Sequence, residues 1–312
     1  MRHAFIRFVG PVMSNRERTW VILLTGDGAD PRTSQNDRVN NPADEFAVSP
    51  DRQTLFEMTL SRASAVVPRE QIVAVVDSPQ KKYWSESLAM LPGANVIVQP
   101  YHRGSAIEVL LAVLTLLERD PWARIMAMPS HHYVGNETAL ASSLLDAATP
   151  TAQTRNNLAI IGIKPEKPDP ESGYIVPGRW FEDDTRSVLR IVKPSGKVLA
   201  RDLVARGALW DSSIVAARAP VLVGILRACV PDLVDQMETA LAQCDGADAR
   251  QRALTQLYAR LPSVDLSHVL AQGAEAQCRV ITSRSCGWSN PASARRTITA
   301  RRPSIGRVAA TV

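Results

Sequence analysis

Apolar runs alternate with segments of helical spacing through the first half of the chain. Five runs are apolar along their whole length, at residues 20–26, 71–77, 95–100, 123–130 and 158–165. Residues 52–67 and 104–118 lie between them and carry apolar side chains at helical spacing, which predicts two helices. Strands that are apolar throughout are typical of a sheet covered on both faces, so the pattern predicts an α/β fold.

The second half of the chain changes character after residue 165. Short strands punctuated by Gly and Pro are predicted in "SGYIVPG" and "VLRIVKP", and a further strand at 208–219. Helical spacing follows at 220–229, 231–243 and 248–260, and a last strand at 278–282. The polar stretch 27–51 is predicted to be a long loop. The whole pattern predicts a doubly wound, Rossmann-like mixed sheet with a short helical C-terminal part.

Polar segments follow three of the predicted strands, where doubly wound sheets bind their ligands. They are "TGDGAD" (25–30), "QPYHRGS" (99–105) and "PSHH" (129–132). Glycines in the first segment let backbone N–H groups approach a phosphate, with an ordinary tight turn as the alternative. The second segment opens a helix, with Arg103 near its positive end and Ser105 as its expected cap, so it could receive a base or a phosphate. A capped helix start without a ligand is the alternative.

Two adjacent histidines, His131 and His132, stand in the third segment. They could be metal ligands, acid–base groups or the remnant of a site that once held something else. Neighbouring residues on an extended strand point to opposite faces, so they are not expected to chelate one ion if the strand stays extended.

Composition narrows the class of protein. The chain has 312 residues, 45% hydrophobic and 21% charged, which is typical of a soluble globular protein. The net charge is +5, but six arginines and no acid follow from Arg284 onward, so the rest of the chain carries about −1. Residues 293–312 are therefore predicted to be a basic, flexible tail; contact with nucleic acid or anionic lipid is the less favoured alternative.

Other features point to the cytoplasm. The four cysteines form no C-x-x-C pair, and we expect free thiols in a reducing compartment. No apolar run approaches the roughly 18 residues of a membrane-spanning helix. We expect a cytoplasmic protein that has neither a membrane nor a nucleic acid as partner.

Eight segments together resemble the sugar-1-phosphate nucleotidyltransferase family, in the family's order. The closest branch is the bacterial mannose-1-phosphate guanylyltransferases. The segments are "LLTGDGADP", "PYHRGSA", "PSHH", "ESGYIVPG", "RIVKP", "LWDSSIV", "SVDLSHV" and "CGWSNPA". They run across residues 19–292, which defines a nucleotidyltransferase-like domain of the nucleotide-diphospho-sugar transferase type. Residues 1–18 are then an N-terminal extension.

The resemblance implies nucleotidyl transfer from a nucleoside triphosphate, GTP favoured, to a sugar-1-phosphate, mannose-1-phosphate favoured. The products would be a nucleotide sugar, here GDP-mannose, and pyrophosphate, with Mg²⁺ as cofactor. The implied nucleotide-binding residues are Thr25, Gly26, Asp27, Gly28, Arg103, Gly104 and Ser105; the sugar-binding residues are Gly173, Tyr174, Trp210 and Asp211; the catalytic residues are Lys193 and Arg32. A homodimer is compatible with this interpretation.

The chain departs from the family at the expected metal ligands. His131 stands in place of the aspartate of the family's "PSDH", and Asn290 in place of the aspartate of "CGWSD". Imidazole and carboxamide replace carboxylate poorly toward Mg²⁺. Asp30, Asp44 or Glu45 of the long loop could supply a ligand instead. The alternative function is therefore a catalytically impaired paralogue that binds nucleotide or nucleotide sugar in a regulatory role.

Overall fold

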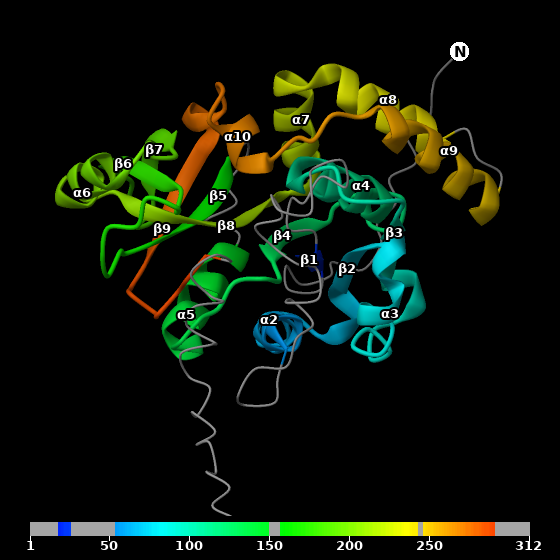
Figure 1. Cartoon of the computed structure of the whole chain (residues 1–312), viewed down its shortest axis with the longest axis horizontal. Coiled ribbons are helices and arrows are strands. Elements are labelled where there is room, and N and C mark those ends of the chain that lie inside the picture. The colour runs from blue at the N-terminus through cyan, green and yellow to red at the C-terminus, as the bar shows by residue number, and fades with distance from the viewer. Residues whose placement is uncertain (1–17, 26–53, 150–156, 243–245, 291–312) are drawn as a thin grey trace, which may run out of the picture.

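The computed structural model describes residues 18–25, 54–149, 157–242 and 246–290 (Figure 1). The strands are β1 (Thr19–Leu24), β2 (Ile72–Asp77), β3 (Val96–Gln99), β4 (Arg124–Pro129), β5 (Leu158–Ile163), β6 (Tyr174–Trp180), β7 (Arg186–Val192), β8 (Leu209–Arg218) and β9 (Cys278–Ser283). The helices are α2 (Leu55–Ser64), α3 (Lys81–Trp84), α4 (Ser105–Leu117), α5 (Glu137–Ala148), α6 (Lys197–Ala205), α7 (Ala219–Cys229), α8 (Pro231–Ala242), α9 (Ala247–Arg260) and α10 (Leu266–Leu270).

The strands form one mixed sheet in the order β3-β2-β1-β4-β8-β5-β9-β7-β6, with a further pairing of β8 and β6. Strands β1 to β4 pair in parallel, as do β5 and β9. Strand β8 runs antiparallel between β4 and β5 and joins the two parallel parts. The carboxyl ends of β1 to β4 therefore lie along one edge of the sheet, next to the N-terminal part of β8.

Helices cover both faces of this sheet (Figure 1). In β1, Ile22 and Leu24 belong to a core cluster that also contains apolar residues of α4 and of α7 to α10. The alternate residues Val21 and Leu23 belong to a second cluster, shared with α2, α3, α5 and α6. Successive strand residues point to opposite faces, so a strand that is apolar throughout must be buried between two helical layers. The predicted α/β class is confirmed.

The apolar runs in the sequence predict which segments form strands, but they do not predict where β8 lies in the sheet. The predicted strand 208–219 corresponds to β8, and the predicted helices 220–229, 231–243 and 248–260 correspond to α7, α8 and α9. Helices α3, α5, α6 and α10 were not predicted. Helix α5 begins after Asn136, whose side chain accepts a hydrogen bond from the Ala139 N–H.

The structure tests the predictions about the cysteines and about membrane-spanning helices, but not those about the loop and the two ends of the chain. Cys229, Cys278 and Cys286 are free thiols, as expected. Within the described residues, no helix combines the length and apolar character needed to cross a membrane. The predicted loop 27–51, residues 1–17 of the predicted extension 1–18 and the tail 293–312 lie outside the described residues.

Candidate functional site

A cavity of about 890 Å³ opens beside the carboxyl ends of the central strands. Its walls come from segments that are far apart in the sequence. The lining residues that carry polar or charged side chains are His102, Ser105, His131, His132, Glu171, Ser172, Lys193, Asp211, Ser213, Ser263, Asp265, Ser267, His268, Gln272 and Asn290. Ser105, His131, Gly173, Lys193, Asp211 and Asn290 were predicted site residues, and all six line this cavity.

The segment that opens α4 is held against residues 263–267 by backbone contacts. The Val264 N–H donates to the Arg103 carbonyl at 2.9 Å, and the Ala106 N–H donates to the Val264 carbonyl at 3.0 Å. Gly104 lies between these bonds with φ +93°, and a Cβ there would stand 2.3 Å from the Val264 oxygen. Only glycine fits such an approach in this backbone conformation.

Ser105 does not cap α4 as predicted. The N-cap is Gly104, and Ser105 is the first helical residue. Its hydroxyl accepts a hydrogen bond from the Leu266 N–H at 2.9 Å. The side chain is therefore used to tie the start of α4 to α10 across the cavity wall.

A second contact joins the histidine segment to the C-terminal part of the described chain. Tyr133 and Ser289 form an antiparallel bridge, and the Gly135 N–H donates to the Cys286 carbonyl at 3.0 Å. The His132 ring meets Trp288 edge to face, with centroids 5.1 Å apart. These contacts bring His131 and Asn290, which are 159 positions apart in the chain, to the same cavity.

A third contact builds the opposite wall from β6 and β8. The Asp211 N–H donates to the Gly173 carbonyl at 2.9 Å. The Trp210 indole N–H donates to the Tyr174 hydroxyl at 3.2 Å, and both side chains are buried behind the cavity. Tyr174 and Trp210 thus support this wall, while Gly173 and Asp211 face the cavity.

Asp211 is a buried carboxylate held by two donors. The Ser213 N–H donates to Oδ1 at 2.8 Å and the Ser267 hydroxyl to Oδ2 at 2.9 Å. Burial raises the pKa of Asp211, and the two hydrogen bonds oppose that rise. Ser213 has φ +55°, a conformation uncommon for a residue with a side chain, and it also lines the cavity.

The two histidines share the cavity rather than facing away from each other. The chain turns after β4, and the His131 and His132 rings meet edge to face with centroids 4.6 Å apart. The expectation of opposite faces was made for an extended strand, and it does not apply because the chain turns at residues 130–131. Burial, with a further contribution from His102, lowers the pKa of His131 to about 4. Burial also lowers the pKa of His132, so both imidazoles are neutral at pH 7.

The two substituted positions do not fit Mg²⁺. His131 offers a neutral imidazole, and Mg²⁺ prefers hard oxygen ligands. The Asn290 amide donates its Nδ2 hydrogens to Ser172 at 3.0 Å and Asp169 at 3.3 Å. The amide oxygen that would face an ion is neutral, whereas the carboxylate that the resemblance expects there is charged. Among the described lining residues, Lys193 is the one lysine or arginine, and the same lining includes the carboxylates of Glu171, Asp211 and Asp265.

Four predicted nucleotide-binding or catalytic residues, Gly26, Asp27, Gly28 and Arg32, lie outside the described residues. Thr25 is buried, and its hydroxyl donates to the Val75 carbonyl at 2.7 Å. Arg103 is buried as well: its Nε donates to the Tyr258 carbonyl at 3.0 Å, and its guanidinium lies over the Tyr101 ring. Arg103 is not among the residues that line the cavity.

The structure also shows lining residues that the sequence analysis did not single out. His102 faces the cavity from the loop before α4, and Ser213 and Ser267 surround Asp211. Both serines lie inside segments already matched to the family, so a reading of every polar residue in those segments would have found them.

Comparison with known proteins identifies distant relatives. A protein of Vibrio cholerae, provisionally described as a mannose-1-phosphate guanylyltransferase, is 22% identical over 78% of this chain and 52% of its own length. The alginate biosynthesis protein AlgA of Pseudomonas syringae is 25% identical over 79% of this chain and 51% of its own. The chain spans about half the length of these curated relatives. No family model matches it.

Solved structures show the same fold. The crystal structure of a mannose-1-phosphate geranyltransferase from Thermus thermophilus superposes with a TM-score of 0.75, at 20% identity over 92% of this chain and 80% of that one. A provisionally described glucose-1-phosphate thymidylyltransferase of Bacillus anthracis gives 0.51, at 12% identity over 91% and 96%. The chain is thus a distant homologue of mannose-1-phosphate guanylyltransferases and of AlgA, with the fold of nucleotidyltransferases.

Proposed function

We propose that this chain binds a nucleoside triphosphate and a sugar-1-phosphate in the cavity and transfers the nucleotidyl group, with GTP and mannose-1-phosphate favoured. One observation carries the proposal. Three separate backbone contacts bring the motif segments that begin at residues 100, 129, 171, 209, 263 and 286 to one cavity. The Vibrio cholerae relative, provisionally described as a mannose-1-phosphate guanylyltransferase, supports the same reaction class.

In this reaction a phosphate oxygen of the sugar-1-phosphate attacks the α-phosphorus of the triphosphate, and the bond to the leaving pyrophosphate breaks. The transition state carries negative charge, which positioned cations stabilise. Lys193 is exposed at the cavity and would neutralise part of the sugar phosphate's charge. Gly173, with Asp211 on the same wall, would face the sugar, and the opening of α4 would position the nucleotide.

A second function is favoured by one specific observation. His131 and Asn290 present no carboxylate where the resemblance expects two, and removing one preorganised charge typically costs about 10²–10³ in rate. The alternative is a catalytically impaired paralogue that binds nucleotide or nucleotide sugar in a regulatory role. Such a paralogue keeps the cavity and Lys193 but lacks the two carboxylates that would bind Mg²⁺.

The test measures turnover and binding on the same preparation. Pyrophosphate release from GTP and mannose-1-phosphate is followed in Mg²⁺ and in EDTA, and GDP-mannose binding is measured by calorimetry. Metal-dependent release supports the transferase. Binding in EDTA without release supports the regulatory alternative. Folded protein that neither binds nor turns over these ligands, or other triphosphate and sugar-phosphate pairs, would contradict both.

Two matched variants locate the ligand. Lys193→Gln removes the one lysine or arginine from the described cavity lining, so we expect GDP-mannose affinity to fall about tenfold or more. Lys197→Gln, on exposed α6 and away from the cavity, should leave affinity unchanged. Equal affinities in the two variants would contradict the placement of the phosphate beside Lys193.

A further inference from the structure

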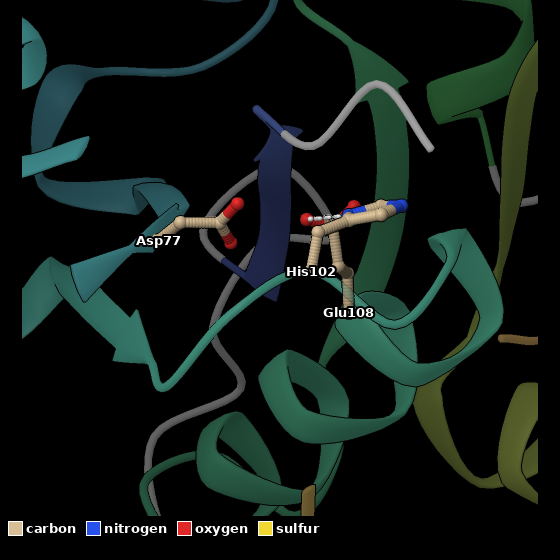
Figure 2. Close-up of side chains that lie close together, drawn as sticks. All are labelled: Asp77, His102 and Glu108. Carbon is tan, nitrogen blue, oxygen red and sulfur yellow. Dashed lines mark hydrogen bonds and ion pairs between the residues drawn. The ribbon is translucent and has the colours of Figure 1, made fainter. Parts of the chain in front are cut away.

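Three ligand-type side chains meet in the interior behind the cavity (Figure 2). Asp77 ends β2, His102 lies in the loop before α4, and Glu108 lies in the first turn of α4. Each offers one ligand atom, and these atoms all lie within 4.8 Å of one another. The side chains are only 2%, 6% and 0% exposed, so this cluster is part of the interior.

The amide of Gln99 lies between the two carboxylates of this cluster. Its Nε2 donates to Asp77 Oδ1 and to Glu108 Oε1, both at 2.7 Å. The buried Tyr258 hydroxyl donates to Gln99 Oε1 at 3.0 Å. His102 Nδ1 is 3.2 Å from Glu108 Oε1. The Gln99 amide thus bridges the two carboxylates, and His102 lies against the one from Glu108.

An independent observation is the second oxygen of Glu108. Glu108 Oε2 is buried and has no hydrogen-bond partner among the described residues. Leaving a buried acceptor unpaired costs about 1–3 kcal/mol, and more when the group is charged. Figure 2 shows the Glu108 carboxylate turned toward the His102 ring and the space facing Asp77. The unpaired oxygen thus belongs to a group that already points into the cluster.

Charge strengthens this observation. Among the described residues, Gln99 and His102 are the side chains within hydrogen-bonding distance of the Glu108 carboxylate, and neither carries a permanent positive charge. Buried carboxylates in proteins are paired with cations or coordinate metals. We propose that Asp77, His102 and Glu108 bind one divalent transition-metal ion, Zn²⁺ or Mn²⁺.

The donor set selects this class of ion. Two carboxylates and one imidazole combine the ligands that suit Mn²⁺ with the ligand that suits Zn²⁺. Rotation of the Gln99 amide by 180° would add its Oε1 as a fourth ligand, while Nε2 then donates to the Tyr258 hydroxyl. Ligand atoms about 2.1 Å from one ion lie at most about 4.2 Å apart, so the cluster needs side-chain shifts below about 1 Å.

His102 connects this cluster to the cavity, because the same residue lines the cavity wall. This gives an ion a path from solvent. It would also place positive charge near a cavity whose His131 and Asn290 do not fit a cation. The inference does not depend on nucleotidyl transfer, since it concerns metal binding in the absence of any nucleotide.

The experiment uses the full chain after removal of metals with a chelator. Protein is dialysed against Zn²⁺ or Mn²⁺, and bound metal is counted by mass spectrometry and titrated by calorimetry. We expect one ion per chain. Glu108→Gln keeps the side-chain shape and removes the charge, and it should weaken binding at least about 100-fold. The matched control Glu86→Gln, at an exposed site after α3, should bind as the parent does.

Two further readouts keep the result decisive. The ion should raise the melting temperature of the parent chain and not that of Glu108→Gln, whose fold is checked by circular dichroism. If Glu108→Gln does not fold, His102→Gln serves in its place. His131→Asn should retain the ion, because His131 is not a ligand. Absence of stoichiometric binding, equal binding in Glu108→Gln, or loss in His131→Asn alone would overturn the proposal.

Discussion

Two groups of residues, one in the cavity wall and one in the interior behind it, differ in the charge that they carry. The wall of His131 and Asn290 presents neutral side chains at the positions where the resemblance expects carboxylates. The cluster behind the cavity, made of Asp77, His102 and Glu108, holds two carboxylates away from bulk water. The comparison teaches that a cation site is decided by where carboxylates stand, rather than by which segments resemble a family.

The strongest way to break the comparison is to restore carboxylates to the neutral wall. In the double variant His131→Asp with Asn290→Asp, we expect Mg²⁺-dependent pyrophosphate release to rise about 10²-fold or more over the parent chain. The single variant His131→Asn, which restores no charge, should show no rise. A double variant that binds substrates without any gain would mean that more than two carboxylates separate this cavity from catalysis.

A second prediction removes the group that holds the charged cluster together. Gln99→Leu leaves the Asp77 and Glu108 carboxylates buried without their bridging amide. In EDTA we expect the free energy of unfolding to fall by about 3–5 kcal/mol, measured by urea denaturation. Gln251→Leu, at an exposed site on α9, should change it by less than about 0.5 kcal/mol. A loss below about 1 kcal/mol for Gln99→Leu would show that the carboxylates are stabilised by other groups.

A third prediction concerns the loss of folding stability at acid pH. The folded pKa of His131 is about 4, below its ordinary value near 6.5, so the unfolded state takes up the proton first. Stability should therefore be complete above pH 6.5 and fall as the pH drops toward 4, by about 2–3 kcal/mol from this histidine. Burial, with His131 and Arg62 nearby, also lowers the pKa of His132, so His132 adds to the same slope. His102 faces the His131 ring as well.

The variant His131→Asn should reduce this loss, followed by urea denaturation between about pH 4 and pH 7. His268→Asn is the matched control, since His268 is exposed. Equal losses at acid pH in the parent and in His131→Asn would place the proton uptake on another group.

The smallest effect is expected at Asp211. Its pKa is raised by burial, so its contribution to stability is present at acid pH and is lost as the pH rises through the folded pKa. Asp211→Asn removes the buried charge and should raise stability by up to about 1 kcal/mol at pH 7, with no gain near about pH 3.5. Urea denaturation at the two pH values measures this, and an equal gain at both would contradict the charge explanation.

The sequence predicts the helices and strands better than it predicts which strands pair with one another. Strands β1 to β5 carry apolar side chains on both faces, so the apolar runs in the sequence reveal them. The partners of β8 are set by packing between residues far apart in the chain, and no local pattern states that it lies between β4 and β5. Helix α5 has only a narrow buried stripe, and its cap at Asn136 was the one local sign of its start.

The cavity wall could be predicted from the sequence to a greater extent than the charged cluster could. Resemblance placed His131, Lys193, Asp211 and Asn290 in segments that the fold brings to one cavity. Asp77 is visible in sequence merely as an acid at a strand end, and Glu108 as one charge within the apolar helix "SAIEVLLAVLTLL". That charge inside an apolar run was the available sign, but its partners become evident when β2, β3 and α4 are packed together.

The antiparallel strand β8 also has a consequence for synthesis of the chain. Strand β4 ends at Pro129, and its partner on one side begins at Leu209, about 80 residues later. At about 5–20 residues per second, several seconds pass on the ribosome before that partner emerges. Until then one edge of β4 has unpaired backbone groups among apolar side chains, which is a site for wrong pairing. Strand β8, which joins the two parallel parts of the sheet, thus also sets how long this edge of β4 waits for its partner while the chain is being made.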